Sequence, residues 1–300
     1  GEVNITITIC TFRRSHIATT LQSLEAMQRP EGCAVSIVVI DNDDTPSAQE
    51  SVDDTAAAMS LPVRYVHQPG ANISIARNAG LDAATTEWVA FLDDDEVVEP
   101  DWLVELVGRQ RETGADAVFG PSYARYDDDA PDWIVRGDFH SQVAAPRAGV
   151  IETGHTCNAL LRWGDAPWRH ERFALERGKS GGEDTEFFFR LRQFGAEYAI
   201  ADTAIVREDV PAARLSVKWL LRRRFRIGQS YSASADSLRQ RLGLFGASSV
   251  KAGYCFLRAG LALANPERRT FWLMRGTMHA GICAGCLKLP EKSLYGVQGG

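Results

Sequence analysis

Apolar runs separated by amphipathic stretches predict alternating strands and helices in the first part of the chain. Residues 5–10 and 35–40 are rich in β-branched side chains, as strands are. The expected strands lie at 5–10, 35–40, 63–66 and 88–92, and the helices between them at 15–28, 47–59 and 73–84. Strands that alternate with helices in this way predict an α/β fold with a mostly parallel sheet flanked by helices.

The rest of the chain has a less regular pattern. We expect a helix at 101–113, a strand at 117–120 and a helix at 183–194, whereas Pro, Gly and Asp throughout 121–150 predict an irregular loop. From 214 to 289 the pattern is helical and basic, with breaks expected at 243–246 and 265–266. These features predict two domains, an α/β domain over 1–210 and a basic helical region over 211–300.

The composition is that of a soluble globular protein. Apolar residues make up 45% of the chain and charged residues 24%, as in soluble globular proteins. No uncharged apolar run reaches the ~18 residues of a membrane-spanning helix. Because residues 1–10 read as the start of a strand, we expect no signal peptide. The six cysteines have no framework spacing, so we expect free thiols and a reducing, cytoplasmic location.

Charge is distributed unevenly along the chain. Residues 211–300 contain 15 Lys and Arg against 3 Asp and Glu, whereas the first 210 residues contain 18 basic and 36 acidic side chains. An acidic region suits divalent cations, and a basic region suits phosphate groups on a nucleotide, a lipid or a nucleic acid. The sign of the charge does not choose among these three ligands.

Polar clusters follow three of the predicted strands. Residues 11–14 follow the first strand, 41–44 the second and 93–96 the fourth. Because ligands bind beyond the carboxyl ends of parallel strands, we expect these clusters to form one site.

The triplet Asp93, Asp94 and Asp95 is the candidate cation site. Carboxylate oxygens are the ligands that Mg²⁺ and Mn²⁺ prefer, and one or two of them can suffice when a substrate phosphate completes the shell. An isolated acidic triplet is as often a solvated turn, but this one follows a buried strand. Asp41 has two possible roles. It could bind a base or ribose, or it could be a turn or helix-cap residue.

Two further clusters could carry chemistry. Glu183 and Asp184 follow two glycines and open a helix, where acids cap the helix or one of them could act as a general base. Residues 222–226 hold four arginines, of which Arg222 and Arg226 could bind a diphosphate. A solvated basic helix is the alternative for this second cluster.

Five motifs taken together resemble the inverting family 2 glycosyltransferases of the GT-A fold, over about residues 4–210. They are Ile9-Cys10-Thr11-Phe12-Arg13-Arg14, Val38-Val39-Ile40-Asp41-Asn42, Ala76-Arg77-Asn78-Ala79-Gly80, Phe91-Leu92-Asp93-Asp94-Asp95 and Gly182-Glu183-Asp184. The segments 206–211 and 219–226 look like bacterial exopolysaccharide transferases of the succinoglycan-synthesis type. The resemblance implies a Rossmann-like GT-A domain with a basic C-terminal helical extension.

The resemblance also implies roles for individual residues. Thr11, Asp41 and Arg77 would hold the uridine of a UDP-sugar, Asp93 would contact the ribose side, and Asp95 with Asp93 would bind Mg²⁺ or Mn²⁺. The motif residues Phe12, Arg13 and Asp94 would line the donor site, with Arg222 and Arg226 gripping the diphosphate. Asp184 would be the catalytic base beside Glu183. Glu208 and His155 are both candidates for a third metal ligand.

The resemblance implies transfer of one sugar, such as glucose from UDP-glucose, to a glycan acceptor on a lipid diphosphate. The chain has no QxxRW string of processive relatives, which favours a single addition. The basic, aromatic C-terminal region suggests peripheral contact with an anionic membrane at the cytoplasmic face, with a soluble helical subdomain as the alternative. No nucleic acid partner is expected. The rival function is a non-catalytic glycan- or nucleic-acid-binding module.

Overall fold

The computed structural model describes residues 1–233 and 235–291. The chain forms two compact units. The sheet unit consists of residues 1–124, 141–179 and 183–208, and the helical unit, within the described residues, of 125–140, 180–182, 209–233 and 235–291. The chain therefore passes between the units several times.

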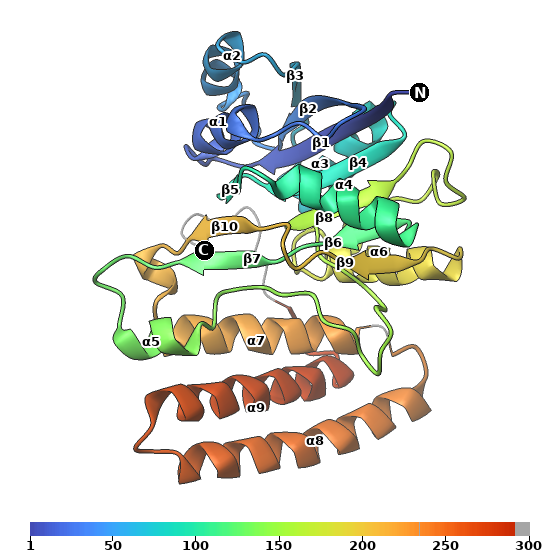
Figure 1. Ribbon diagram of the computed structural model, residues 1–300. Helices are drawn as coiled ribbons and strands as arrows, with labels where there is room; N and C mark the ends of the chain where they lie inside the picture. Colours follow the sequence, from blue (N-terminus) through green and yellow to red (C-terminus); the bar gives the residue numbers. More distant parts are fainter. Residues whose placement is uncertain (234, 292–300) are drawn as a thin grey trace. The chain divides into compact units, whose positions relative to one another are not determined.

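A seven-stranded sheet in the order β3-β2-β1-β4-β8-β6-β9 forms the centre of the sheet unit (Figure 1). Its strands are β1 (Val3–Thr11), β2 (Cys33–Asp41), β3 (Val63–His67), β4 (Trp88–Asp93), β6 (Ala117–Phe119), β8 (Asn158–Arg162) and β9 (Tyr198–Ile200). The pairings of β1 with β2 and β4, and of β2 with β3, are parallel, whereas β8 runs antiparallel to β4 and β6. The predicted mostly parallel α/β fold is confirmed.

Helices cover both faces of this sheet, since strands such as β2 and β4 bury apolar side chains on both sides. The helices of the unit are α1 (Ile17–Ala26), α2 (Gln49–Ala57), α3 (Ile73–Ala83), α4 (Trp102–Thr113) and α6 (Glu183–Gln193). Ile7 of β1 shares one core cluster with Leu21 of α1 and Leu103 of α4. The opposite face includes Phe91 of β4 and Phe188 of α6, whose rings meet edge to face.

The sequence pattern did not predict the second sheet, whose strands lie in the order β5-β10-β7. Its strands are β5 (Glu96–Val98), β7 (Ser122–Arg125) and β10 (Val206–Asp209). The expectation that 121–150 is irregular is therefore only partly right, because the segment contains β7 and the short helix α5 (Asp132–Gly137). Strands of three or four residues are too short for a periodic pattern to identify.

The helical unit contains α7 (Val217–Ser232), α8 (Leu238–Leu261) and α9 (Pro266–Cys286), with α9 packed against both of the others (Figure 1). The predicted break at 265–266 is confirmed, since Asn265 caps α9. The predicted break at 243–246 is wrong, because α8 runs through these residues. The chain turns earlier instead, where the Ser237 side chain caps the first turn of α8.

Short 3₁₀ helices occur at Leu175–Arg177 in the sheet unit and at Ala212–Arg214 in the helical unit. All six cysteines are free thiols, as expected from their spacing. Within the described part of the chain, no helix is both long enough and apolar enough to cross a lipid bilayer.

Candidate active site

The polar clusters at the ends of three neighbouring strands lie side by side. β1 is hydrogen-bonded to β2 on one side and to β4 on the other, and the register pairs Thr11 with Asp41 and Cys10 with Asp93. The parallel pairing thus brings segments 11–14, 41–44 and 93–96 to one edge of the sheet. This edge is the candidate active site.

Asp41 is fully buried, and both of its oxygens accept hydrogen bonds from the protein. Oδ1 accepts from the Asp43 amide at 3.1 Å. Oδ2 accepts from the Ala48 amide at 2.9 Å and from the Tyr65 hydroxyl at 2.5 Å. The Asp41 carboxylate therefore fixes the turn after β2, as the turn-residue reading predicts.

Two asparagines extend this fixed edge toward a distant segment of the chain. The Asn42 Oδ1 atom accepts from the Asn72 amide at 2.8 Å, and Asn72 caps α3 through its own side-chain oxygen. The Asn72 Nδ2 atom donates to the Leu175 carbonyl at 3.0 Å. Side-chain amides therefore link the end of β2, the start of α3 and the segment that precedes α6.

The acidic segment after β4 contacts residues of the segment after β1. The Thr11 hydroxyl donates to Asp94 Oδ2 at 2.8 Å, and Arg14 Nη1 lies 2.7 Å from Asp95 Oδ2. The other Asp95 oxygen, Oδ1, is buried and has no hydrogen-bond partner in the protein. An unpartnered buried carboxylate oxygen is costly, so this atom is a candidate cation ligand.

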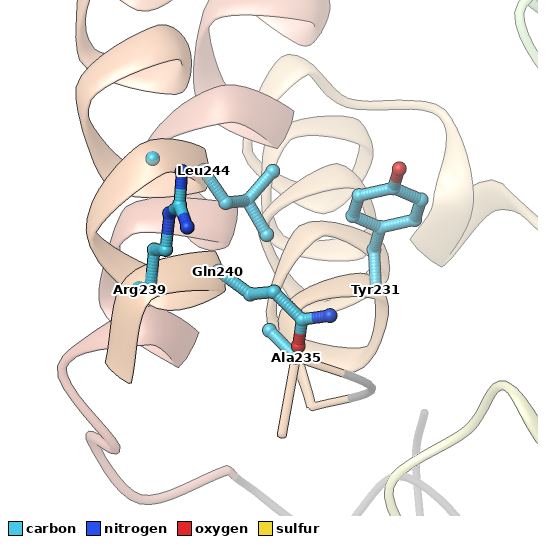
Figure 2. Close-up of a pocket in the computed structure, with 6 residues that line it drawn as sticks. Tyr231, Ala235, Arg239, Gln240 and Leu244 are labelled. Atoms are coloured by element: carbon cyan, nitrogen blue, oxygen red, sulfur yellow. The ribbon is translucent and has the colours of Figure 1, made fainter. Parts of the chain in front are cut away.

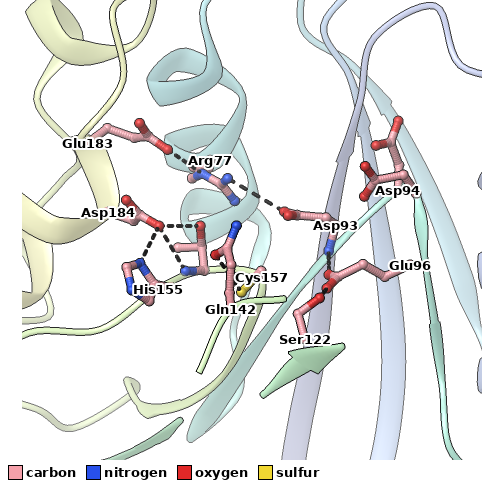
Figure 3. A network of polar contacts seen from close by, with 12 residues as sticks. Arg77, Asp93, Asp94, Glu96, Ser122, Gln142, His155, Cys157, Glu183 and Asp184 are labelled. Carbon is pink, nitrogen blue, oxygen red and sulfur yellow. Dashed lines mark hydrogen bonds and ion pairs between the residues drawn. The ribbon is translucent and has the colours of Figure 1, made fainter. Parts of the chain in front are cut away.

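Arg77 on α3 lies between the acids after β4 and those on α6. Its Nη2 atom is 3.7 Å from Asp93 Oδ1, and its Nε atom is 3.5 Å from Glu183 Oε1 (Figure 3). Arg77 is 8% exposed, and its Nε atom makes no hydrogen bond within the protein. One buried guanidinium therefore connects the acidic triplet 93–95 to the acids that open α6.

The site holds more buried carboxylates than nearby cations can balance. Burial raises the pKa of Asp93 to about 6 and that of Asp94 to about 7, and neighbouring acids add to both shifts. Burial and the adjacent Asp184 likewise raise the pKa of Glu183 to about 7, against the opposing effect of Arg77. A bound cation would relieve this excess of negative charge.

Asp184, at the start of α6, has a different environment from Glu183. Its Oδ2 atom accepts from the Thr156 amide at 3.1 Å and lies 3.8 Å from His155 Nδ1 (Figure 3). Burial alone raises the pKa of Asp184, but these donors and the charge of Arg77 outweigh it and hold the pKa well below its ordinary value. Asp184 is therefore ionised at neutral pH and can accept a proton or a hydrogen bond.

The donor set suits a hard divalent cation that a substrate phosphate helps to hold. In residues 1–233 and 235–291, no three His, Cys, Asp or Glu side chains form a ready-made metal cluster. Asp93 and the unpartnered Asp95 Oδ1 nevertheless supply two carboxylates, as Mg²⁺ and Mn²⁺ require when phosphate oxygens complete the shell. The residues present fit such an ion.

The remaining predicted site residues have distinct positions. The Arg13 guanidinium lies 4.9 Å from the centre of the Phe12 ring and pairs with Asp43 at 2.9 Å, at the same edge of the sheet. Arg222 and Arg226 lie on α7 of the helical unit. The second candidate metal ligand, Glu208, lies on β10.

Three supporting residues received no individual role from the sequence. Glu96 is fully buried and accepts from the Asp93 amide at 2.8 Å and from the Ser122 hydroxyl at 2.7 Å. Thr156 holds Asp184 from a segment far away in sequence. A signal existed for Glu96, which directly follows the acidic triplet, but Ser122 and Thr156 have none.

Comparisons with known proteins agree with this architecture. The model of the family "Glycosyl transferase family 2" matches residues 6–165. The "Succinoglycan biosynthesis protein ExoM" of Rhizobium meliloti (strain 1021) is 44% identical over 300 residues, covering 99% of this chain and 97% of the relative.

Solved structures show the same fold at low sequence identity. The mannosyltransferase PcManGT from Pyrobaculum calidifontis, in complex with GDP-Man and Mn²⁺, superimposes with a TM-score of 0.65 at 18% identity, covering 95% of this chain and 87% of that one. S. aureus TarS gives a TM-score of 0.53 at 14% identity, covering 94% of this chain and 55% of TarS. The chain belongs to glycosyl transferase family 2 and is a glycosyltransferase of the GT-A fold.

Proposed function

We propose that this glycosyltransferase moves a single sugar, with inversion, from a UDP-sugar such as UDP-glucose to a glycan acceptor in exopolysaccharide synthesis. The observation that carries the proposal is the buried Arg77, which lies between Asp93 and Glu183 at the edge formed by β1, β2 and β4. The high identity to a succinoglycan biosynthesis protein over nearly its whole length supports the polysaccharide assignment.

The donor would bind at the strand ends. Thr11 and Arg77 would contact the nucleotide, and Asp41, which holds the turn after β2, would support the uridine. We assign Phe12, Arg13, Asp93 and Asp94 to the same donor site, and Arg222 and Arg226 to the diphosphate. This assigns the transfer chemistry to the predicted domain 1–210, with 211–300 as its helical extension.

Asp95 and Asp93 would hold Mg²⁺ or Mn²⁺ at this site, as the Mn²⁺-bound mannosyltransferase of the same fold suggests. When bound, such an ion would supply positive charge that stabilises the departing diphosphate. Arg77 adds a second positive charge beside Asp93. Glu208 and His155 are the proposed candidates for a further ligand.

Asp184 would accept the proton of the attacking acceptor hydroxyl. Asp184 is ionised at neutral pH, and the Thr156 amide holds its orientation. A positioned general base is worth ~10²–10⁴-fold in rate. Glu183 would act beside it by holding Arg77 in place.

A panel of nucleotide-sugars with and without Mn²⁺ tests the proposal. We expect UDP-sugars to raise the melting temperature most, only with the divalent ion, and one of them to release UDP when a lipid-diphosphate-linked glycan is added. A rival non-catalytic binding module would bind glycan without releasing nucleotide. Stabilisation by GDP-sugars alone would overturn the UDP assignment.

The lipid-linked acceptor implies work at a membrane surface. We therefore extend the proposal to a peripheral position at the cytoplasmic face of the membrane, with no nucleic acid partner. The basic side chains and aromatic rings of the helical unit, such as the Arg258 guanidinium 4.9 Å from the Trp272 ring centre, support this extension.

A further inference from the structure

The outward side of α8 is apolar although it faces away from the rest of the helical unit. Ser248, Ala252, Cys255 and Ala259 form the buried side of this helix, which packs on α9. At 100° per residue, Val250, Leu257 and Leu261 fall on the opposite side. Their exposed fractions are 75%, 63% and 77%.

Two further large apolar side chains of α8 are exposed. Leu242, near its start, and Tyr254, in its second half, are more than half exposed. We call Leu242, Val250, Tyr254, Leu257 and Leu261 the α8 outer face. Several large exposed apolar side chains on one side of a helix indicate a binding surface rather than chance exposure.

The charges around the α8 outer face have one sign. From residue 237 to residue 266 the chain has no acid, and its charged residues are Arg239, Arg241, Lys251 and Arg258. Helices α7, α8 and α9 together carry twelve Lys and Arg and a single acid, Glu267, which pairs with Arg136.

Several of these cations lie close enough to repel one another. Burial and then the charges of Arg223 and Arg275 lower the pKa of Arg224 on α7. Burial and then Lys251 and Arg275 lower the pKa of His279 on α9. The buried Nδ1 atom of His279 has no hydrogen-bond partner in the protein. The unit thus has excess positive charge that an anionic partner would neutralise.

A hollow of about 520 Å³ lies at the first turns of α8. Figure 2 shows Arg239 and Gln240 of α8 on its wall, with Tyr231 contributed by α7. The Arg239 guanidinium thus lies at one end of the α8 outer face. A cation could bind lipid headgroups there while the apolar side chains of the face contact the acyl layer.

We propose that the α8 outer face is a docking surface for an anionic lipid bilayer, with Val250, Leu257 and Leu261 inserted among the acyl chains and Arg239, Lys251 and Arg258 at the headgroup phosphates. A second copy of the chain is the less suitable occupant. Pairing two α8 outer faces would bring their basic margins together with no acid on either helix to compensate. The surface serves the proposed lipid-linked acceptor, but vesicle binding is measured without any transfer reaction.

Vesicle flotation of the full chain tests this inference. We expect the protein to float with vesicles of equal parts phosphatidylcholine and phosphatidylglycerol, and to remain in the bottom fraction with phosphatidylcholine alone. Val250→Glu and Leu257→Glu should each weaken vesicle affinity at least about tenfold, because an inserted side chain is lost. Lys251→Ser should weaken it about fivefold.

The control is Phe194→Glu, which introduces the same charge at an apolar side chain of the sheet unit that is 44% exposed. This variant should float like the unchanged protein. Circular dichroism and melting temperature identify any variant that fails to fold. In that case Lys251→Ser, which changes an exposed side chain, tests the proposal by its effect on flotation. Flotation unaffected by Val250→Glu, Leu257→Glu and Lys251→Ser would overturn the proposal. A protein that stays at the bottom and forms dimers broken by Leu257→Glu would assign the surface to a second copy.

Discussion

The sheet unit and the helical unit use charge in opposite ways. In the sheet unit, carboxylates are buried at one edge and Arg77 connects them, so that polar groups lie inside and the apolar strands are fully covered. In the helical unit, cations gather around an apolar face that no described helix covers. Buried acids thus indicate chemistry in the first unit, whereas exposed apolar side chains indicate association in the second.

The largest effect is expected from Asp184→Asn. Loss of the proton acceptor should lower the transfer rate by ~10²–10⁴-fold, while nucleotide affinity changes little because Asp184 is not at the strand ends. Steady-state transfer and calorimetric UDP binding would be measured together. An unchanged transfer rate would remove Asp184 from the role of base and leave the chemistry of the sheet unit to other groups.

Asp95→Asn should produce the next largest effect. The variant removes charge from the buried Oδ1 position that has no protein partner. We expect UDP affinity in Mn²⁺ to fall by about 10–100-fold and to become nearly independent of the ion. Glu112→Gln, at an exposed acid on α4, is the matched control and should retain ion-dependent binding. Equal UDP affinity of the unchanged protein with and without Mn²⁺ would contradict the metal assignment.

The raised pKa of Glu183 predicts that stability falls as pH rises. Without metal, the unfolded carboxyl loses its proton near its ordinary pKa of 4.5, but the folded carboxyl, with a pKa of about 7, keeps it longer. The native state therefore binds more protons between these values, and the free energy of unfolding decreases across that window. Glu183→Gln should make this decrease smaller, by up to about 3 kcal/mol. Denaturant unfolding at several pH values measures it, and parallel curves for both proteins would refute the prediction.

The smallest effects come from two glycines of the helical unit and have opposite signs. A Cβ at Gly281 of α9 would collide with the Phe225 carbonyl of α7, so Gly281→Ala should destabilise this unit by about 1–3 kcal/mol. A Cβ at Gly243 of α8 meets nothing, so Gly243→Ala should stabilise it by about 0.5–1 kcal/mol. The melting temperatures of the two variants measure these effects. Shifts of the same sign would contradict the packing described for α8 and α9.

The sequence predicted the elements with long apolar patterns. The strands β1 and β2 and the helices α3 and α4 lie within a few residues of their expected positions. The three-residue strand β5 has too few residues for any pattern. Gly243 and Gly246 suggested a break because glycine weakens helices, but packing on α9 keeps α8 continuous.

The acids of the candidate site could be anticipated because they follow strands or open a helix. Their partners could not, since contacts such as Thr156 with Asp184 join residues 28 positions apart and depend on the tertiary fold. The same holds for Asp41, whose hydrogen bond from Tyr65 became visible only with β2 and β3 paired.

The two linked asparagines keep part of the candidate site ordered before a substrate binds. Because Asn42 holds Asn72, and Asn72 holds the Leu175 carbonyl, the loop after β2 keeps its shape through contacts internal to the polypeptide. That part of the edge is therefore preorganised. The loop would lose little conformational entropy when a nucleotide binds. The affinity for the nucleotide would therefore be higher than with a flexible loop.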